Sequence, residues 1–225
     1  MSMGTLASAA SDMGGQLRGA DCSFNSVSTD TRSLTAGQLF FALRGERFDA
    51  AAFIADAALR GAAGAVVECF ASASLPQIEV TDTRLALGLL AQKWRQKFAI
   101  PMIGITGSNG KTTVKELTTA IMRTVFAEAG DDAVLATRGN LNNDIGLPLT
   151  LLSLRDQHRV AVIEMGANHP GEIAVLADIA AVNVAIITNA ARAHIEGFGS
   201  VEEVARTKGA ILDGLGARGT AVLNR

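Results

Sequence analysis

Between residues 101 and 114 the chain reads Pro-Met-Ile-Gly-Ile-Thr-Gly-Ser-Asn-Gly-Lys-Thr-Thr-Val. The β-branched and apolar run 100–106 predicts a buried strand, and apolar residues after Lys111 recur at helical spacing. Gly107 and Gly110 lie between the two, where glycine lets backbone N–H groups converge without Cβ clashes. The dipole of the following helix would direct its positive end at an anion in this turn. The stretch therefore predicts a phosphate cradle.

We expect the cradle to bind a nucleotide through its consecutive residues Gly107, Ser108, Asn109, Gly110, Lys111, Thr112 and Thr113. Lys111 would reach the outer phosphates, and the Thr112 hydroxyl would hold Mg²⁺. The general pattern G-x-x-x-x-G-K-[ST] requires glycine at position 105, which is Ile105 here. A glycine-rich turn that binds nothing is the alternative, but Gly-Lys-Thr-Thr directly after an apolar strand favours the cradle.

Composition limits the class of protein. The 225 residues are 48% hydrophobic, enough for one large or two small domains. Charged residues make up 19%, the net charge is -2, and Lys and Arg are dispersed, so we expect no nucleic-acid partner. The N-terminus lacks the features of a secretory signal, and no apolar run reaches the ~18 residues of a membrane helix. We therefore expect a cytoplasmic protein with no membrane contact, in which Cys22 and Cys69 are reduced.

The first part of the chain predicts a small α/β unit. Residues 1–20 predict only a short helix or a partly ordered entry segment. Strands are then expected at Cys22–Val27, Gln38–Leu43 and Ala65–Glu68, with an alanine-rich helix at 50–60 and another opening at Thr81-Asp-Thr83. This unit would end near Phe98, giving domains 1–98 and 99–225.

From Ile100 onward, strands alternate with helices. The expected strands after the cradle are Val134–Thr137, Val160–Ile163, Val184–Thr188 and Thr220–Leu223, and the expected helices start at Leu147, Glu172 and Ser200. Such alternation predicts a parallel sheet with helices on both faces, and ligands collect at the carboxyl ends of its strands. Because the sequence stops just after a strand, we expect a protein truncated within this domain.

Glu164 follows an apolar strand at the edge where the cradle also opens. A strand-terminal acid alone would be a solvated loop residue, but a neighbouring phosphate cradle favours a metal ligand. Mg²⁺ prefers hard oxygen ligands, and Thr112 with Glu164 would supply two of them.

Polar residues beyond the other strands are further candidates. Asn140, Asn142 and Asn143 lie in one loop, where ligand contact and an ordinary turn remain equally open. His194 follows the next strand, although a lone histidine is usually structural. Lys208 lies on an amphipathic helix, where lysine is normally solvated; facing a metal, it would have to be neutral or modified because an ammonium is repelled.

These motifs resemble the Mur ligase family, the ATP-dependent amide-forming enzymes of peptidoglycan precursor synthesis. Residues 106–113 fit the family's T-G-[ST]-x-G-K-[ST]-[ST], which accounts for the shifted glycine. The loop Asn140–Pro148 and the segments Glu164–His169 and His194–Gly199 are similar to further family motifs. The resemblance covers nearly the whole chain from about Ser26.

The resemblance implies roles for individual residues. Thr112 and Glu164 would hold one Mg²⁺, Glu164 and His194 a second, and Lys208 would be carbamylated, which supplies an anionic oxygen ligand. Lys111, His194 and Lys208 would be the catalytic residues. Asn143 would contact ATP, whereas the substrate would be bound by Asn140, Asn142, Asp30, Thr31, Arg32, Arg44, Glu46 and Arg47. Ala50, Ala51 and Ala52 stand where the family often has Gly or Ala, His and Asp, so the roles of those side chains do not carry over.

The implied reaction joins D-alanyl-D-alanine to UDP-N-acetylmuramoyl-tripeptide, because the Asn140–Pro148 loop resembles that of the members with this substrate. ATP would phosphorylate the tripeptide carboxylate, and the dipeptide amine would displace phosphate from the acyl phosphate. We expect a monomer. The family's C-terminal domain is missing from this sequence, so we expect binding of the UDP-peptide without turnover.

Three alternatives stay open at this point. The first is the neighbouring ligase that adds the third residue, or related folylpolyglutamate synthesis, against which the Asn140–Pro148 loop argues. The second is a P-loop GTPase or nucleotide switch, against which the lack of an Asn-Lys-x-Asp motif argues. The third is a noncatalytic binding module.

Overall fold

The computed structural model describes residues 2–45, 48–191 and 198–224, without the side chains of residues 48, 49 and 131. The chain divides into two compact units, Met1–Lys93 and Trp94–Arg225. Trp94 and Arg95 belong to the second unit because they bond to it: Trp94 Nε1 donates to Leu154 O at 3.2 Å, and Arg95 Nε donates to Ala180 O at 3.0 Å. The boundary predicted from the sequence lies a few residues later, between residues 98 and 99.

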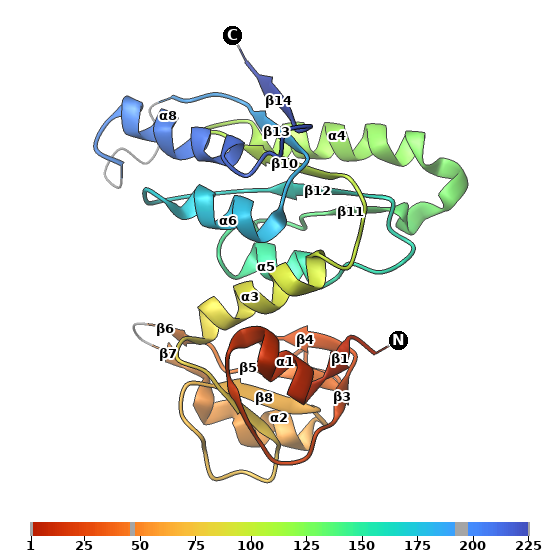
Figure 1. The fold of residues 1–225 in the computed structure, drawn as a ribbon, viewed down its shortest axis with the longest axis vertical. Coiled ribbons are helices and arrows are strands. Elements are labelled where there is room, and N and C mark those ends of the chain that lie inside the picture. The colour runs from red at the N-terminus through yellow and green to blue at the C-terminus, as the bar shows by residue number, and fades with distance from the viewer. Residues whose placement is uncertain (1, 46–47, 192–197, 225) are drawn as a thin grey trace. The chain divides into compact units, whose positions relative to one another are not determined.

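The first unit is a mixed sheet with helices packed on it (Figure 1). Its strand order is β2-β9-β8-β5-β4, parallel except for the β2–β9 pair. The strands are β2 (Gln16–Arg18), β4 (Ser26–Ser28), β5 (Gln38–Phe41), β8 (Gly64–Val67) and β9 (Gln77–Glu79). Two small antiparallel pairs are β1 (Gly4–Thr5) with β3 (Ser23–Phe24) and β6 (Arg44–Gly45) with β7 (Phe48–Asp49). The helices are α1 (Leu6–Met13), η1 (Ala50–Phe53), α2 (Ile54–Leu59) and α3 (Thr83–Arg95), whose last two residues belong to the second unit.

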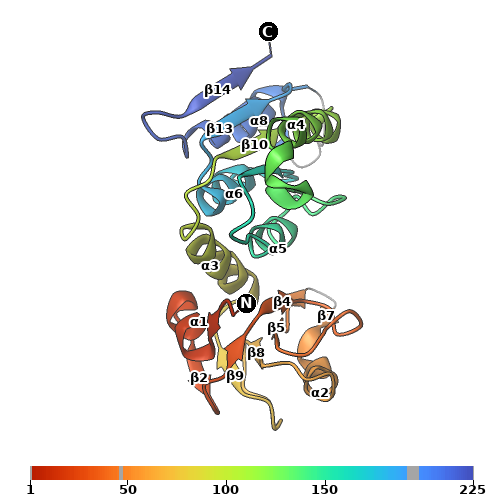
Figure 2. The ribbon, with the colours of Figure 1, turned by 90° about the vertical axis from the view of Figure 1, so that its right-hand side faces the viewer.

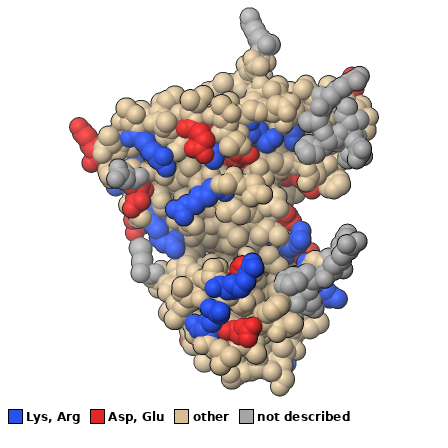
Figure 3. Space-filling view, turned by 180° about the vertical axis from the view of Figure 1, so that it is seen from behind, with Lys and Arg blue, Asp and Glu red and all other residues tan. Residues whose placement is uncertain are grey.

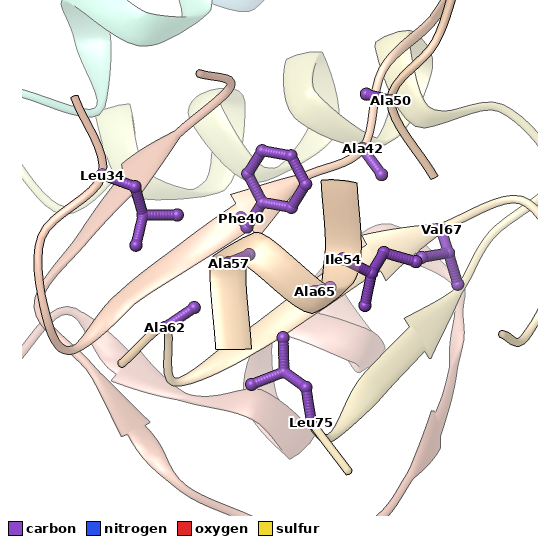
Figure 4. Close-up of a cluster of buried hydrophobic side chains, with 10 residues drawn as sticks. All are labelled: Leu34, Phe40, Ala42, Ala50, Ile54, Ala57, Ala62, Ala65, Val67 and Leu75. Atoms are coloured by element: carbon purple, nitrogen blue, oxygen red, sulfur yellow. The ribbon is translucent and has the colours of Figure 1, made fainter. Parts of the chain in front are cut away.

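Part of the core of this unit is an alanine-rich cluster between α2 and the sheet (Figure 4). Small side chains from α2 and β8 let the helix approach the strands closely, and Phe40 and Ile54 fill the space that remains. The buried members are Leu34, Phe40, Ala42, Ala50, Ile54, Ala57, Ala62, Ala65, Val67 and Leu75.

The second unit is built on one parallel sheet in the order β11-β12-β10-β13-β14 (Figures 1 and 2). Its strands are β10 (Met102–Thr106), β11 (Val134–Ala136), β12 (Val160–Glu164), β13 (Val184–Ile187) and β14 (Thr220–Leu223). Its helices are α4 (Lys111–Val125), η2 (Ala127–Ala129), η3 (Asp131–Ala133), α5 (Gly146–Leu151), α6 (Glu172–Ala180), α8 (Val201–Gly209) and η4 (Ala210–Leu212). The predicted α/β class and parallel sheet are confirmed.

Different helices cover the two faces of this sheet. Ile105 packs against Val114 and Met122 of α4 in one apolar cluster. The neighbouring Gly104 points the other way, since a Cβ there would meet Ile211 of η4 at 3.1 Å. Helices α6 and α8 both contact η4 on that second face. All strands run in one direction, so the loops after β10, β12 and β13 meet at the same edge, where the cradle lies.

Some local predictions were wrong. The short helix expected within residues 1–20 is confirmed as α1, but weak periodicity did not reveal β1 and β2 on either side of it. The strand expected at Cys22–Val27 is divided into β3 and β4, which pair with different partners. Strand β9 was missed because three residues between a proline and a turn carry too little pattern.

Charges are mixed on the surface. Figure 3 shows Lys and Arg among Asp and Glu on the face drawn, with large uncharged areas between them. Within residues 2–45, 48–191 and 198–224, no helix combines the length and the apolar character that crossing a bilayer requires.

Helix α2 offers a matched test of the core in the first unit. Ile54 is 2% exposed, whereas Leu59 on the same helix is 88% exposed. Ile54→Ala should lower the free energy of unfolding by about 2–4 kcal/mol through lost burial and a cavity, and Leu59→Ala by less than about 0.5 kcal/mol. Urea denaturation followed by circular dichroism measures both. Equal effects of the two substitutions would contradict this packing.

Candidate functional site

The cradle turn depends on two glycines. Gly107 has φ 144° and Gly110 has φ 77°, both in the region that side chains with a Cβ avoid. A Cβ on Gly107 would lie 2.0 Å from Thr188 Oγ1, so the turn tolerates no larger residue there. Helix α4 begins at Lys111 without a side-chain cap, and Val114 N donates to Gly110 O at 3.0 Å. The N–H groups of residues 110–113 therefore face the turn as an uncapped, electropositive helix end.

The loop after β13 fastens the cradle from one side. Asn189 accepts from Ser108 N with its carbonyl and from Asn109 N with Oδ1, both at 3.0 Å. Thr188 Oγ1 donates to Asn109 O at 2.6 Å, and Ala191 N donates to Ser108 Oγ at 3.0 Å. The N–H groups of Ser108 and Asn109 are thus occupied within the protein. Asn189 was not among the predicted site residues. It directly follows the expected strand Val184–Thr188, and this position at the edge where ligands collect could have indicated it.

Lys111 lies over the turn. Its Nζ donates to Gly107 O at 2.8 Å and to Ser108 O at 3.3 Å. Burial lowers the pKa of the Lys111 ammonium from its ordinary value, and the Glu164 carboxylate acts in the opposite direction. The half-buried cation is therefore held where an anion in the turn would meet it.

Glu164 is buried at the end of β12 and oriented by three polar partners. The residue is only 2% exposed. Oε2 accepts from Thr112 Oγ1 at 3.1 Å, and Oε1 accepts from Asn142 Nδ2 at 2.8 Å. Its backbone N–H donates to Thr137 Oγ1 at 3.0 Å. The predicted pair of Thr112 and Glu164 is thus brought together next to the helix end.

The donor set at this point fits a hard cation. Thr112 and Glu164 contribute hydroxyl and carboxylate oxygens, which Mg²⁺ prefers, but two protein oxygens do not complete its shell. In the part of the chain that the structure describes, no group of three or more His, Cys, Asp or Glu could hold a metal by itself. Phosphate oxygens and waters would have to supply the remaining ligands. His194, the other predicted metal ligand, lies outside the described residues.

Lys208 is buried on α8 with 3% exposure. Its Nζ lies 3.4 Å from Ala167 O and 5.3 Å from the centre of the Phe198 ring. The pKa of Lys208 is lowered to about 8, mainly by burial and also by the Lys111 cation, while Glu172 acts in the opposite direction. The predicted modified lysine is therefore an amine that loses its proton far more readily than a solvated one. The hydroxyl of the adjacent Thr207 is buried with no partner among the described atoms.

The three asparagines of the loop before α5 have separate positions. Asn142 orients Glu164, whereas Asn143 Oδ1 accepts from Gly146 N at 2.9 Å at the start of α5. Asn140 is exposed, as are Asn109 and Thr113 of the cradle. The side chains of Asn142 and Asn143 thus both form hydrogen bonds within the protein, and their contacts with the substrate and ATP, respectively, stay predictions.

A cavity of about 500 Å³ lies in the first unit. It is lined by Thr29, Asp30, Thr31, Arg32, Phe40, Ala50 and Phe53. Asp30 accepts from Nε and Nη2 of Arg32 at 2.7–3.1 Å, and this contact lowers the pKa of Asp30 to about 2. Sequence reasoning included the polar residues 30–32 but missed the two phenylalanines, which resemble ordinary core residues in the sequence.

Of the predicted substrate residues in 44–47, the structure describes the side chain of Arg44 alone. Arg44 forms an ion pair with Glu68 at 3.5 Å and does not line the cavity. Glu46 and Arg47 lie outside the described residues. Ala50 lines the cavity and contributes a small apolar surface there.

Comparison with known proteins relates this geometry to a family. A family model for the Mur ligase middle domain matches residues 105–225, which contain the cradle, Glu164 and Lys208. The UDP-N-acetylmuramoyl-tripeptide--D-alanyl-D-alanine ligase of Escherichia coli (strain K12) is 49% identical over 98% of this chain and 47% of its own length. The ligase of the same name from Bacillus subtilis (strain 168) is 40% identical over 87% of this chain and 42% of its own length.

Solved structures agree with the sequence comparison. A crystal structure of MurF from Acinetobacter baumannii matches with a TM-score of 0.89 and 38% identity, over 98% of this chain and 48% of that one. The MurF ligase from Thermotoga maritima, in complex with ADP, matches with a TM-score of 0.77 and 32% identity, over 88% of this chain and 45% of that one. The chain thus spans about half the length of these relatives. Because the family model covers more than half of it, the chain belongs to the Mur ligase family.

Proposed function

We propose that this chain is part of an ATP-dependent ligase that joins D-alanyl-D-alanine to UDP-N-acetylmuramoyl-tripeptide. The observation that supports this most strongly is the contact of Thr112 with Glu164 at the uncapped start of α4, in a chain 49% identical to a ligase with that name. The names of the relatives favour this reaction over addition of the third residue, and the family model argues against a nucleotide switch.

The nucleotide would bind with its phosphates against the N–H groups of residues 110–113 and Lys111 Nζ. Thr112 and Glu164 would hold one Mg²⁺, Glu164 and His194 would hold a second, and a carbamylated Lys208 would add an anionic oxygen ligand. Bound Mg²⁺ would withdraw charge from the phosphate oxygens during transfer. Lys111 and the helix end would reduce the repulsion between the substrate carboxylate and the triphosphate, both of which are anions.

The chemistry would proceed in two displacements. A carboxylate oxygen of the tripeptide forms a bond to the γ-phosphorus, and ADP leaves with the electron pair of the broken P–O bond. The dipeptide amine then attacks the acyl carbon, loses a proton, and releases inorganic phosphate. Both steps depend on a site that orients the reactants and brings them together.

The cavity of the first unit would hold the uridine diphosphate end of the substrate. Its size suits part of a nucleotide, and Phe40 and Phe53 provide aromatic surface against a base. The Asp30 carboxylate orients the Arg32 guanidinium at this cavity, where it would meet the diphosphate. Such substrates and ATP agree with the cytoplasmic location expected from the sequence.

The proposal is tested by titration calorimetry with UDP-N-acetylmuramoyl-tripeptide. We expect saturable binding, which Arg32→Met should weaken about tenfold or more because a charge-assisted phosphate contact is lost. Arg18→Met is the matched control, since Arg18 lies over Phe70 and does not line the cavity. No binding by the wild type, or equal losses in the two variants, would contradict the assignment.

Lys111 provides a separate test of the nucleotide site. Lys111→Met should weaken ADP binding by about tenfold to a hundredfold, the value of one buried charge-assisted contact. Lys93→Met, which removes an exposed lysine from α3, should leave the affinity unchanged. Titration calorimetry at one fixed salt concentration compares them. An ADP affinity that Lys111→Met leaves intact would exclude the cradle as the phosphate site.

Carbamylation of Lys208 is expected from its burial and lowered pKa, because only a neutral amine combines with carbon dioxide. The product is an anion, which also removes the repulsion from Lys111. Nuclear magnetic resonance with carbon-13 bicarbonate should show a carbamate signal in the wild type and in Lys93→Met but not in Lys208→Met. A signal that persists in Lys208→Met would place the modification elsewhere.

A further inference from the structure

A second lysine of α4 is buried without any part in the chemistry proposed above. Lys115 lies one helical turn after Lys111 and is only 2% exposed. Its Nζ donates to Thr137 O at 3.0 Å and pairs with the Glu116 carboxylate at 2.6 Å. A buried ammonium is costly unless it is paired and hydrogen-bonded, so these two contacts fix its position.

Thr137 is held at three points just beyond β11. Its N–H donates to Val162 O at 3.1 Å, and its carbonyl accepts from Lys115. Its hydroxyl accepts from the backbone N–H of Glu164 at 3.0 Å. The pairing of β11 with β12 ends at Ala136. In a longer strand the Thr137 carbonyl would accept from the Glu164 N–H, and here the Thr137 hydroxyl accepts from it instead.

These contacts close a ring around Glu164. Thr112 and Lys115 are neighbours on one face of α4, three residues apart. Thr112 binds the Glu164 carboxylate directly, and Lys115 reaches the Glu164 backbone through Thr137. The side chain and the backbone of Glu164 are therefore both linked to α4 by hydrogen bonds, and α4 begins at the cradle.

We propose that Lys115 and Thr137 are positioning residues that hold the Glu164 carboxylate toward Thr112 for Mg²⁺ binding. The inference rests on the proposed function. Removing the Thr137 hydroxyl leaves the buried N–H of Glu164 without its acceptor and lets the end of β12 shift. Partners behind a metal ligand typically change metal affinity by about tenfold to a hundredfold when they are substituted.

The test compares ADP titrations in Mg²⁺ and in chelator for the wild type, Thr137→Val, Thr137→Ser and Lys115→Met. Thr137→Val should reduce the gain in ADP affinity that Mg²⁺ provides by about tenfold, while metal-free ADP affinity stays that of the wild type. Thr137→Ser keeps the hydroxyl and should retain the gain. Lys115→Met should behave as Thr137→Val does. Thr124→Val on the exposed side of α4 serves as the control, because its hydroxyl bonds only within the helix to Ala120 O.

The outcomes separate this inference from the function on which it rests. If Lys115→Met does not fold, the two Thr137 variants still decide, because Val replaces the hydroxyl by a methyl group whereas Ser keeps the hydroxyl and removes the methyl group. A Thr137→Val variant with the full Mg²⁺ gain would overturn the inference. So would equal losses of metal-free and metal-dependent affinity, which mark a general structural role. A wild type whose ADP binding ignores Mg²⁺ would instead overturn the proposed function, and the inference with it.

Discussion

The second unit is organised around one buried carboxylate. Glu164 is 2% exposed and has one carboxylate oxygen on Thr112 and the other on Asn142. A buried carboxylate is costly unless it is hydrogen-bonded, so the end of β12, the start of α4 and the loop before α5 must keep these positions together. The interaction thus couples three segments that are distant in sequence at the edge where the strands end.

The electrostatics around this carboxylate are those of a site prepared for anions. Lys111 and the uncapped end of α4 supply positive potential on one side. Lys208 is buried and lies close enough to Lys111 to be repelled by its charge. Both effects lower the pKa of Lys208. Such an arrangement is unfavourable by itself and is relieved by phosphate, or by converting one amine into an anion. Asn189 fixes the shape of the turn by accepting hydrogen bonds from the backbone N–H groups of Ser108 and Asn109.

The sequence predicted the features that depend on local pattern. Apolar runs and the Gly-Lys-Thr-Thr turn predicted β10, α4 and the edge at which Thr112 and Glu164 meet, because parallel strands end on one side. It did not predict which of several similar polar residues would be used. Asn142 and Asn143 are adjacent and chemically identical, yet one orients Glu164 and the other accepts from the start of α5. Lys115 resembles a solvated cation in the sequence, and only the packing of α4 on the sheet buries it.

We infer that Glu164 and Thr112 mark the metal position beside a phosphate bound at the start of α4. A crystal structure of this chain with ADP and Mn²⁺, with the ion located by anomalous scattering, would test this inference. We expect the β-phosphate against the N–H groups of residues 110–113 and the manganese ion in contact with Thr112 and Glu164. Nucleotide bound at another surface, or an ion that leaves Glu164 bonded to Thr112 and Asn142 alone, would contradict it.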